Sequence, residues 1–344
     1  AIVSISLFFK QKWKIQFGII DSLVFLFMLI SFLLIVQSKD EGFSTKHILL
    51  ALILMLFFYF RLLFQTSKQI IYWLTVCFIF IGLVEAIWGL RQLYGYESSQ
   101  HNLFRITGSF FNPGPYACYV AIILPIAFYY MLKYHICCKV KIHIRNIRIY
   151  LLWSIAFLTV VFSILILPTV MSRASWLAST GGCSLVLLFF LAEDKKIKAA
   201  IASNVKKCIS IASIIALLMV VCGIGMYKFK KDSADGRTLI WKNTIELIKQ
   251  NPTGVGIGNF SGSYGHIQAA YFEAENVTND EKRVAGNPEY AFNEYLQICA
   301  EQGILVVLLF IGTVGYSLYI GIKRKKIAPT ASLIVLLITA SVSY

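Results

Sequence analysis

A single arginine, Arg173, lies between two apolar runs in the stretch LPTVMSRASWLAST, residues 167–180. A charged side chain at the bilayer centre costs about 2.5 to 3.5 kcal/mol on insertion scales, so a cation in such a short hinge is a candidate functional residue. The alternative is an arginine that reaches the membrane surface and only marks the end of a helix. The choice depends on whether other polar segments supply partners for an anion site.

A second arginine, Arg237, lies in the segment SADGRTLIWKNTIELIKQNPTGVGIGNF. Apolar residues recur there at helical spacing: Trp241, Ile245 and Ile248. An Asn-Pro pair ends the pattern, so we predict an amphipathic helix over about 236–250. Arg237 would then lie in the first turn, where free backbone N–H groups and a guanidinium favour an anion such as phosphate. A surface ion pair with Asp232 or Asp235 is the alternative.

The glycines of GVGIGNF lie directly after this predicted helix. A dinucleotide-binding loop would follow a strand and would have a different spacing, so we reject that interpretation. We expect these glycines to form tight turns.

Three polar residues near the end of the chain recur at i, i+4 and i+8: Asn293, Gln297 and Glu301. They share one helix face, with Glu294 beside it, just before an apolar run. We expect this face to line a cavity. Ordinary solvation of a helix end is the alternative.

The stretch RITGSFFNPGPYACYV, residues 105–120, begins another apolar run. Asn112 and the following proline have a structural explanation, because proline suits the first turn of a helix. Arg105 adds another cation that we expect on the same side of the membrane as Arg173.

The composition defines the class of protein that positions these residues. The chain has 58% hydrophobic and 15% aromatic residues, which is typical of a polytopic membrane protein. Apolar runs long enough to cross a bilayer recur along the chain. We predict membrane spans near residues 17–36, 47–64, 70–90, 110–132, 149–170, 175–192, 208–227, 302–322 and 328 to the end. Asp21 and Glu85 fall inside these spans, in a proton relay or in polar contacts between helices.

Lysine and arginine concentrate in alternate loops, which predicts that these loops are cytoplasmic. The net charge of +15 is therefore mainly a topology signal, and we do not expect nucleic-acid binding. The remaining segments are predicted to lie outside the cytoplasm: 37–46, 91–109, the Arg173 hinge and 228–301.

We predict an all-α fold, a polytopic transmembrane helix bundle with a large extracytoplasmic loop that contains short amphipathic helices. Three parts are expected: a bundle of about seven helices at 1–227, an extracytoplasmic loop domain at 228–301 that carries several of the candidate site residues, and C-terminal transmembrane helices at 302–344. The last span ends abruptly and is expected to be truncated.

Four segments occur in the order found in the O-antigen ligase and O-antigen polymerase superfamily: RITGSFFNPGPYA, SRASWLA, GRTLIWKNTIELIKQNPTGVGIGNF and AFNEYLQICAEQGI. The chain resembles this superfamily over about residues 105–315. The resemblance implies a glycosyltransferase of the bacterial inner membrane. Its donor would be an undecaprenyl-diphosphate-linked glycan, and its active site would face the periplasm without a metal or another cofactor.

The resemblance also implies roles for individual residues. Arg173 and Arg237, with Arg105 as a further candidate, match arginines that bind the donor diphosphate, whose negative charge grows as the sugar leaves. Asn293, Gln297 and Asn112 would support the site.

A family histidine that orients or activates the acceptor is replaced here by Phe292. The candidate bases are therefore Glu301, Glu294 and His266. Glu301 is preferred because it matches the acidic residue of the family segment E-x-G, and we expect it to be exposed and ionised.

The acceptor remains open between lipid A core, a growing glycan and a protein hydroxyl. We favour a ligase over a polymerase or a protein O-oligosaccharyltransferase, because polymerases vary more in sequence. A flippase for lipid-linked glycans is the rival from another class, but it should show internal repeats, and the sequence has none. The expected partners are the lipid-linked donor, the acceptor and membrane lipids.

Overall fold

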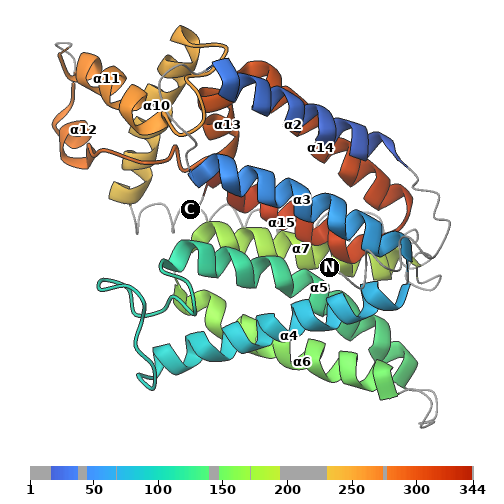
Figure 1. The fold of residues 1–344 in the computed structure, drawn as a ribbon. Helices are drawn as coiled ribbons and strands as arrows, with labels where there is room; N and C mark the ends of the chain where they lie inside the picture. The colour runs from blue at the N-terminus through green and yellow to red at the C-terminus, as the bar shows by residue number, and fades with distance from the viewer. Residues whose placement is uncertain are drawn as a thin grey trace, which may run out of the picture.

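The computed structural model describes residues 17–37, 45–66, 68–138, 147–170, 172–193, 231–273 and 277–342. Every regular element within these ranges is a helix (Figure 1). Six of the described helices are long and apolar enough to cross a membrane, which confirms the predicted all-α polytopic bundle. The predicted span at 208–227 and most of the basic loops used to predict the orientation lie outside the described residues.

The apolar helices lie close to the predicted spans, because hydropathy alone locates runs of this length. They are α2 (Ile19–Gln37), α3 (Thr45–Thr66), α4 (Lys68–Leu93), α5 (Pro113–Cys138), α6 (Ile147–Ile166), α7 (Arg173–Glu193), α14 (Ile304–Lys323) and α15 (Ile327–Val342), with a 3₁₀ turn, η2 (Leu167–Val170), after α6. Among them, α2 and α15 contain the shorter apolar segments.

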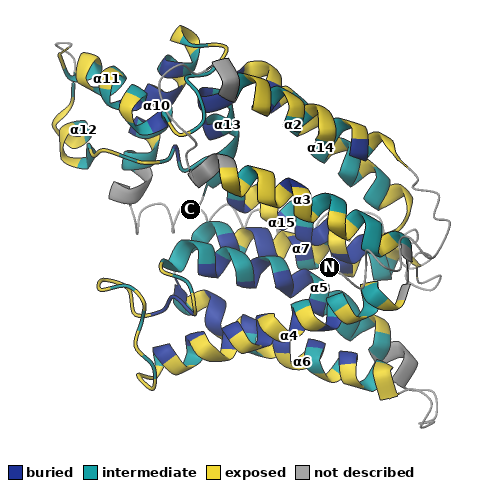
Figure 2. Ribbon diagram, in the orientation of Figure 1, coloured by how far each residue is buried: buried dark blue, intermediate teal, exposed yellow. Residues whose placement is uncertain are grey.

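Helix α5 forms the centre of the bundle and packs against α4, α6, α7 and α15. Asn112 caps the beginning of α5, since its side chain accepts a hydrogen bond from Gly114 N at 3.0 Å. Pro113 is the first residue of the helix, a position that suits proline. Gly182 lets α7 pack closely against α15 and α5, because a Cβ atom there would lie 2.6 Å from Val335 of α15 and 2.8 Å from Pro125 of α5. Figure 2 shows more buried residues on α5 than on α3.

Helices α2 and α3 lie at the edge of the bundle, where α2 packs on α14 and α3 on α4. Their charged residues pair with each other: Arg61 Nε lies 2.9 Å from a carboxylate oxygen of the buried Asp21. Glu85 on α4 accepts hydrogen bonds from the backbone and side chain of Ser109. Both acidic residues therefore make polar contacts between segments, which was one of the two predicted roles.

Four further helices form a group beyond one end of the bundle (Figure 1). They are α10 (Lys231–Gln250), α11 (Phe260–Glu273), α12 (Asn279–Val284) and α13 (Glu294–Gln302). A small apolar core joins α10, α11 and α13 around Leu247, Phe260, Tyr264, Ala291 and Ala300.

The amphipathic helix predicted at 236–250 exists, but α10 begins earlier, at Lys231. Its buried face also differs from the prediction, because Leu247 is buried whereas Ile245 is 45% exposed. Asn243 and Thr244 are buried as well. Because polar side chains share the buried face of α10, the spacing of its apolar residues does not identify that face. The division of the chain at 227 and 301 stays a prediction.

The beginnings of α5 and α7 and the end of α15 lie at the same end of the bundle as this helix group. Tyr295 of α13 donates a hydrogen bond to Leu337 O of α15 at 3.3 Å, and Trp241 of α10 donates to Ala291 O at 2.9 Å. We call this end the site end. The opposite end contains basic residues, among them Lys325, which pairs with Glu193 at 3.0 Å.

Candidate active site

Helix α13 carries the polar stripe predicted from the sequence. It begins at Asn293, whose side chain accepts hydrogen bonds from Tyr295 N and Leu296 N at 3.0 and 3.2 Å. Asn293 is therefore the N-cap of the helix, which is a common use of asparagine. The helix ends at Gly303, whose positive φ of 89° suits glycine.

The glycine-rich segment 251–259 binds the C-terminal end of α13. Val255 N donates to Ala300 O and Gly256 N donates to Glu301 O, each at 2.9 Å. Gly254, Gly256 and Gly258 all have φ angles between 90° and 98°, in the region that favours glycine. This confirms that these glycines form tight turns, and the turns satisfy carbonyl groups that the end of a helix would otherwise leave free.

Glu301 lies beneath this segment. It is 7% exposed, and its carboxylate accepts a hydrogen bond from Gly258 N at 3.1 Å. The expectation that Glu301 is exposed is therefore wrong, because the glycine-rich segment covers it. Only tight turns were predicted for this segment. The carboxylate helps to hold this segment against α13.

Gln297, one turn earlier, is also buried. Its Oε1 accepts a hydrogen bond from Ala291 N at 2.7 Å, and since a backbone N–H can only donate, this contact fixes the orientation of the amide. The buried Nε2 atom has no hydrogen-bond partner within the described residues. Buried N–H donors are normally hydrogen-bonded, and a water molecule or a bound ligand would provide the acceptor here.

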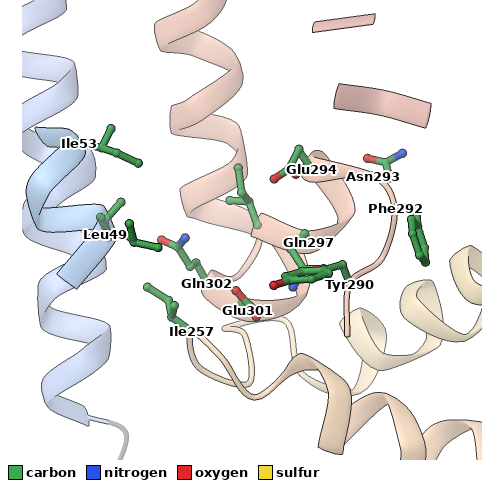
Figure 3. A pocket seen from close by; sticks show the side chains of 12 residues that line it. Leu49, Ile53, Ile257, Tyr290, Phe292, Asn293, Glu294, Gln297, Glu301 and Gln302 are labelled. Carbon is green, nitrogen blue, oxygen red and sulfur yellow. The ribbon is translucent and has the colours of Figure 1, made fainter. Parts of the chain in front are cut away.

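A cavity of about 290 Å³ lies between α3 and α13 (Figure 3). Leu49 and Ile53 of α3 form an apolar side, and Gln297 and Glu301 of α13 belong to the polar side. The prediction that the stripe lines a cavity is confirmed. We call this space the α3 cavity.

A second cavity, of about 920 Å³, lies between the beginning of α5, the end of α15 and the segment before α13. Asn112 and Pro115 line it from α5, and Thr339 lines it from α15. We call this space the α5 cavity. Both cavities are lined by the same three residues, Tyr290, Phe292 and Glu294, so they adjoin along this segment.

Phe292 has φ 51°, an uncommon conformation for a residue with a side chain. Backbone strain of this kind is often found at functional sites. Its ring centre lies 5.9 Å from the guanidinium carbon of Arg237, within the range of a cation–π contact. Phe292 therefore connects Arg237 with both cavities.

Arg237 lies in the second turn of α10 and not in the first, because the helix begins at Lys231. The predicted use of free backbone N–H groups at this helix end is therefore wrong. The guanidinium donates instead to Val342 O at the end of α15. Burial and, as a smaller effect, the positive charge of Arg173 lower the pKa of Arg237. The two arginines therefore lie close enough to repel each other.

Arg173 is the first residue of α7, so it is the arginine that lies at a helix N-terminus, where the backbone carries partial positive charge. Ser172 and Ser175 are hydrogen-bonded to each other at 2.9 Å beside it. A helix end and two guanidiniums at one place form a strongly positive region suited to an anion.

Two predicted site residues lie elsewhere. His266 is exposed on α11 and lines neither cavity. Arg105 is exposed and lines a separate cavity that shares no residue with the other two. Tyr290, which was not predicted as a site residue, lines both site cavities. Its position in a proline-marked loop just before α13 was the available signal.

Six described helices long and apolar enough to cross a membrane, with a polar helix group and two cavities at one end, define a multi-pass membrane protein. Residues 157–311 match the family model described as O-antigen ligase. This match supports the resemblance to the O-antigen ligase and polymerase superfamily, a family of glycosyl-transfer enzymes that act on glycans or lipid-linked substrates in membranes. No curated protein matches the chain. The matched range contains Arg173, Arg237 and α13, whereas the motif at 105–117 lies outside it.

Replacing Gly254 with alanine should release the end of α13. An added Cβ atom would lie 2.5 Å from Glu301 O, and alanine disfavours the φ of 90°. We expect a loss of about 1 to 3 kcal/mol of stability from backbone strain alone. The measurement is the midpoint of thermal unfolding of the purified chain. Gly262→Ala is the matched control, since its Cβ would meet no atom within 4 Å. Equal midpoints for both variants would contradict the role of the segment.

Proposed function

We propose that the protein is a glycosyltransferase of the O-antigen ligase type. It transfers a glycan from undecaprenyl diphosphate to lipid A core at the periplasmic face of the bacterial inner membrane. The observation that carries this proposal is the placement of two arginines at the site end: Arg237 lies against Phe292 and the end of α15, and Arg173 begins α7.

Two guanidiniums held close together repel each other, so an anion bound between them stabilises the arrangement. A diphosphate fits this position because its oxygen atoms can each accept hydrogen bonds from a planar guanidinium. The guanidiniums stabilise the diphosphate most as its bond to the sugar breaks, since negative charge then grows on the departing diphosphate. The N-terminus of α7 adds a favourable field at the same place.

The two adjoining cavities suit two substrates. Arg237 donates to Val342 O at the end of α15, and Thr339 near that end lines only the α5 cavity of the two, which favours that larger space for the donor. The acceptor would then occupy the α3 cavity, where the Gln297 amide could donate to one of its oxygen atoms. Glu294 lines both cavities and is thus well placed between the two substrates.

In the proposed reaction, the carboxylate of Glu294 takes the proton of an acceptor hydroxyl. The acceptor oxygen attacks C1 of the first sugar, and the bond from C1 to the phosphate oxygen breaks. The electron pair of that bond leaves with the diphosphate. Glu294 is preferred to Glu301 as the base because Glu301 is buried and binds Gly258 N.

The periplasmic placement rests on charge. Lys323, Arg324, Lys325 and Lys326 lie at the end of the bundle opposite the site end, and short basic loops face the cytoplasm in most membrane proteins. On this basis we propose the three-part organisation of a bundle at 1–227, a periplasmic unit at 228–301 and C-terminal helices at 302–344, with 228–301 covering the site.

Complementation of a strain that lacks the gene tests the function. The wild-type chain should restore long polymer on lipid A core, and its absence should leave bare core with accumulated lipid-linked polymer. Arg237→Lys should reduce transfer about tenfold to a hundredfold, because lysine lacks the planar fork of donors. Gels of lipopolysaccharide and of extracted lipid-linked glycans provide the measurement.

Arg283→Lys is the matched control, because Arg283 is 60% exposed and pairs with Asp280 at the surface. Core that carries a single repeat in the deletion strain would indicate a polymerase. An unchanged ladder would contradict the ligase, as would full activity of Arg237→Lys.

Replacing Glu294 with glutamine should lower kcat by about a hundredfold or more and leave the KM for the donor nearly unchanged, because a general base acts on the acceptor proton. Glu301→Gln should retain most of the activity, since its oxygen can still accept from Gly258 N. Steady-state kinetics of the purified chain with lipid-linked donor and lipid A core distinguish the two. The opposite ranking would assign the base to Glu301.

A further inference from the structure

The connection between α4 and α5 folds back on the end of α4 and is held there by one buried amide. Gln92 is 1% exposed. Its Oε1 accepts from Thr107 N and Gly108 N at 2.9 and 2.8 Å, and its Nε2 donates to Ser98 O and Gly108 O at 3.1 and 3.0 Å. Both donors and both acceptor positions of the amide are therefore used.

A second anchor lies about two helix turns earlier in α4. Glu85 accepts hydrogen bonds from Ser109 N at 3.1 Å and Ser109 Oγ at 2.6 Å. Thr107, between the two anchors, is completely buried, and its hydroxyl accepts from Gln100 N at 3.2 Å. The connection therefore has a fixed path and can present side chains in a defined arrangement.

A cavity of about 380 Å³ opens on this connection. Its lining combines charged and polar groups with one aromatic ring: Glu97, His101, Asn102, Phe104 and Arg105. It shares no residue with the α3 cavity or the α5 cavity. This cavity is the location of Arg105, which the proposed reaction does not use.

The ring of His101 is oriented by the backbone of Leu103. Its Nδ1 accepts from Leu103 N at 3.0 Å, so the neutral imidazole carries its proton on Nε2 and can donate there. Phe104 packs against this ring, with 4.8 Å between the ring centres, and stays 44% exposed. Tyr94 and Tyr96, on the same connection, are 71% and 77% exposed.

We infer that this cavity is a saccharide-binding subsite, separate from the reaction site. A sugar offers hydroxyl groups that both donate and accept, and it also has apolar C–H faces. The cavity has matching groups: an amide at Asn102, an imidazole at His101, a guanidinium at Arg105 and the aromatic face of Phe104. Sites of this kind combine a few placed polar groups with apolar surface.

The inference rests on the proposed function for the source of the sugars. The first sugar of the donor lies at the diphosphate, so the more distant sugars of a long glycan must pass over the site end. The connection between α4 and α5 lies at this end, because its last residues, Phe111 and Asn112, line the α5 cavity. The subsite would hold part of the glycan and favour long donors over short ones.

Exposed tyrosines also occur where proteins meet the membrane surface. The charged lining favours the saccharide, since Glu97 and Arg105 would lose hydration in contact with lipid. Contact with the bilayer is therefore the competing outcome of the test.

Binding of lipid-free oligosaccharides to the full chain in detergent tests the inference directly. The probes are oligosaccharides released by mild acid from the lipid-linked glycan of the host, and saturation-transfer NMR with titration measures their dissociation constants. Asn102→Ala and Phe104→Ala should each weaken binding at least tenfold. Asn279→Ala, an exposed asparagine on α12, is the control and should bind as the wild type does. Thermal unfolding midpoints verify that each variant is folded, and Phe104→Tyr should retain binding.

Equal binding by the wild type and both loop variants would overturn the inference, as would failure of the wild type to bind. Quenching of a fluorophore at position 103 by lipid-borne quenchers in nanodiscs would also overturn it, because the connection would then lie in the bilayer. Arg237→Lys should leave oligosaccharide binding unchanged while it impairs transfer. If the chain transfers no glycan but still binds oligosaccharides through Asn102, the proposed function fails and the subsite stands.

Discussion

The backbone bonds between the glycine-rich segment 251–259 and the end of α13 are the constraint on which the site depends. They leave α13 with a fixed end, and Asn293 fixes its beginning. Because both ends are held, Gln297 and Glu301 face the α3 cavity, and the segment before α13 separates this cavity from the α5 cavity. Without fixed ends, α13 would not hold the side chains of Gln297 and Glu301 in a defined position at the α3 cavity.

Electrostatics adds a second constraint at the same end of the bundle. Arg237 is held by the end of α15 and by the ring of Phe292, and Arg173 is held by its place at the start of α7. The positive charge of Arg173 contributes to the lowered pKa of Arg237, so an anion bound near both would be stabilised. Phe292, which stands where the family resemblance implies a histidine, lies against the guanidinium of Arg237.

Hydropathy predicted most of the described membrane helices, because a run of apolar residues of sufficient length has few other uses. The family resemblance, from ordered motifs, was also confirmed by the match at residues 157–311. Properties set by tertiary contacts were not predictable. Arg105 was assigned to the diphosphate because the sequence could not show that Gln92 and Glu85 anchor its loop beside a separate cavity. The burial of Glu301 depends on a segment more than forty residues distant in sequence.

The most direct test of the central claim is a comparison of two lipids by native mass spectrometry of the full chain. Undecaprenyl diphosphate and undecaprenyl monophosphate differ only in the group that the two arginines are proposed to hold. We predict that the wild-type chain retains the diphosphate at collision energies that remove the monophosphate, and that Arg173→Ala/Arg237→Ala retains both equally. Equal retention of the two lipids by the wild type, or an unchanged preference in the double variant, would contradict the account.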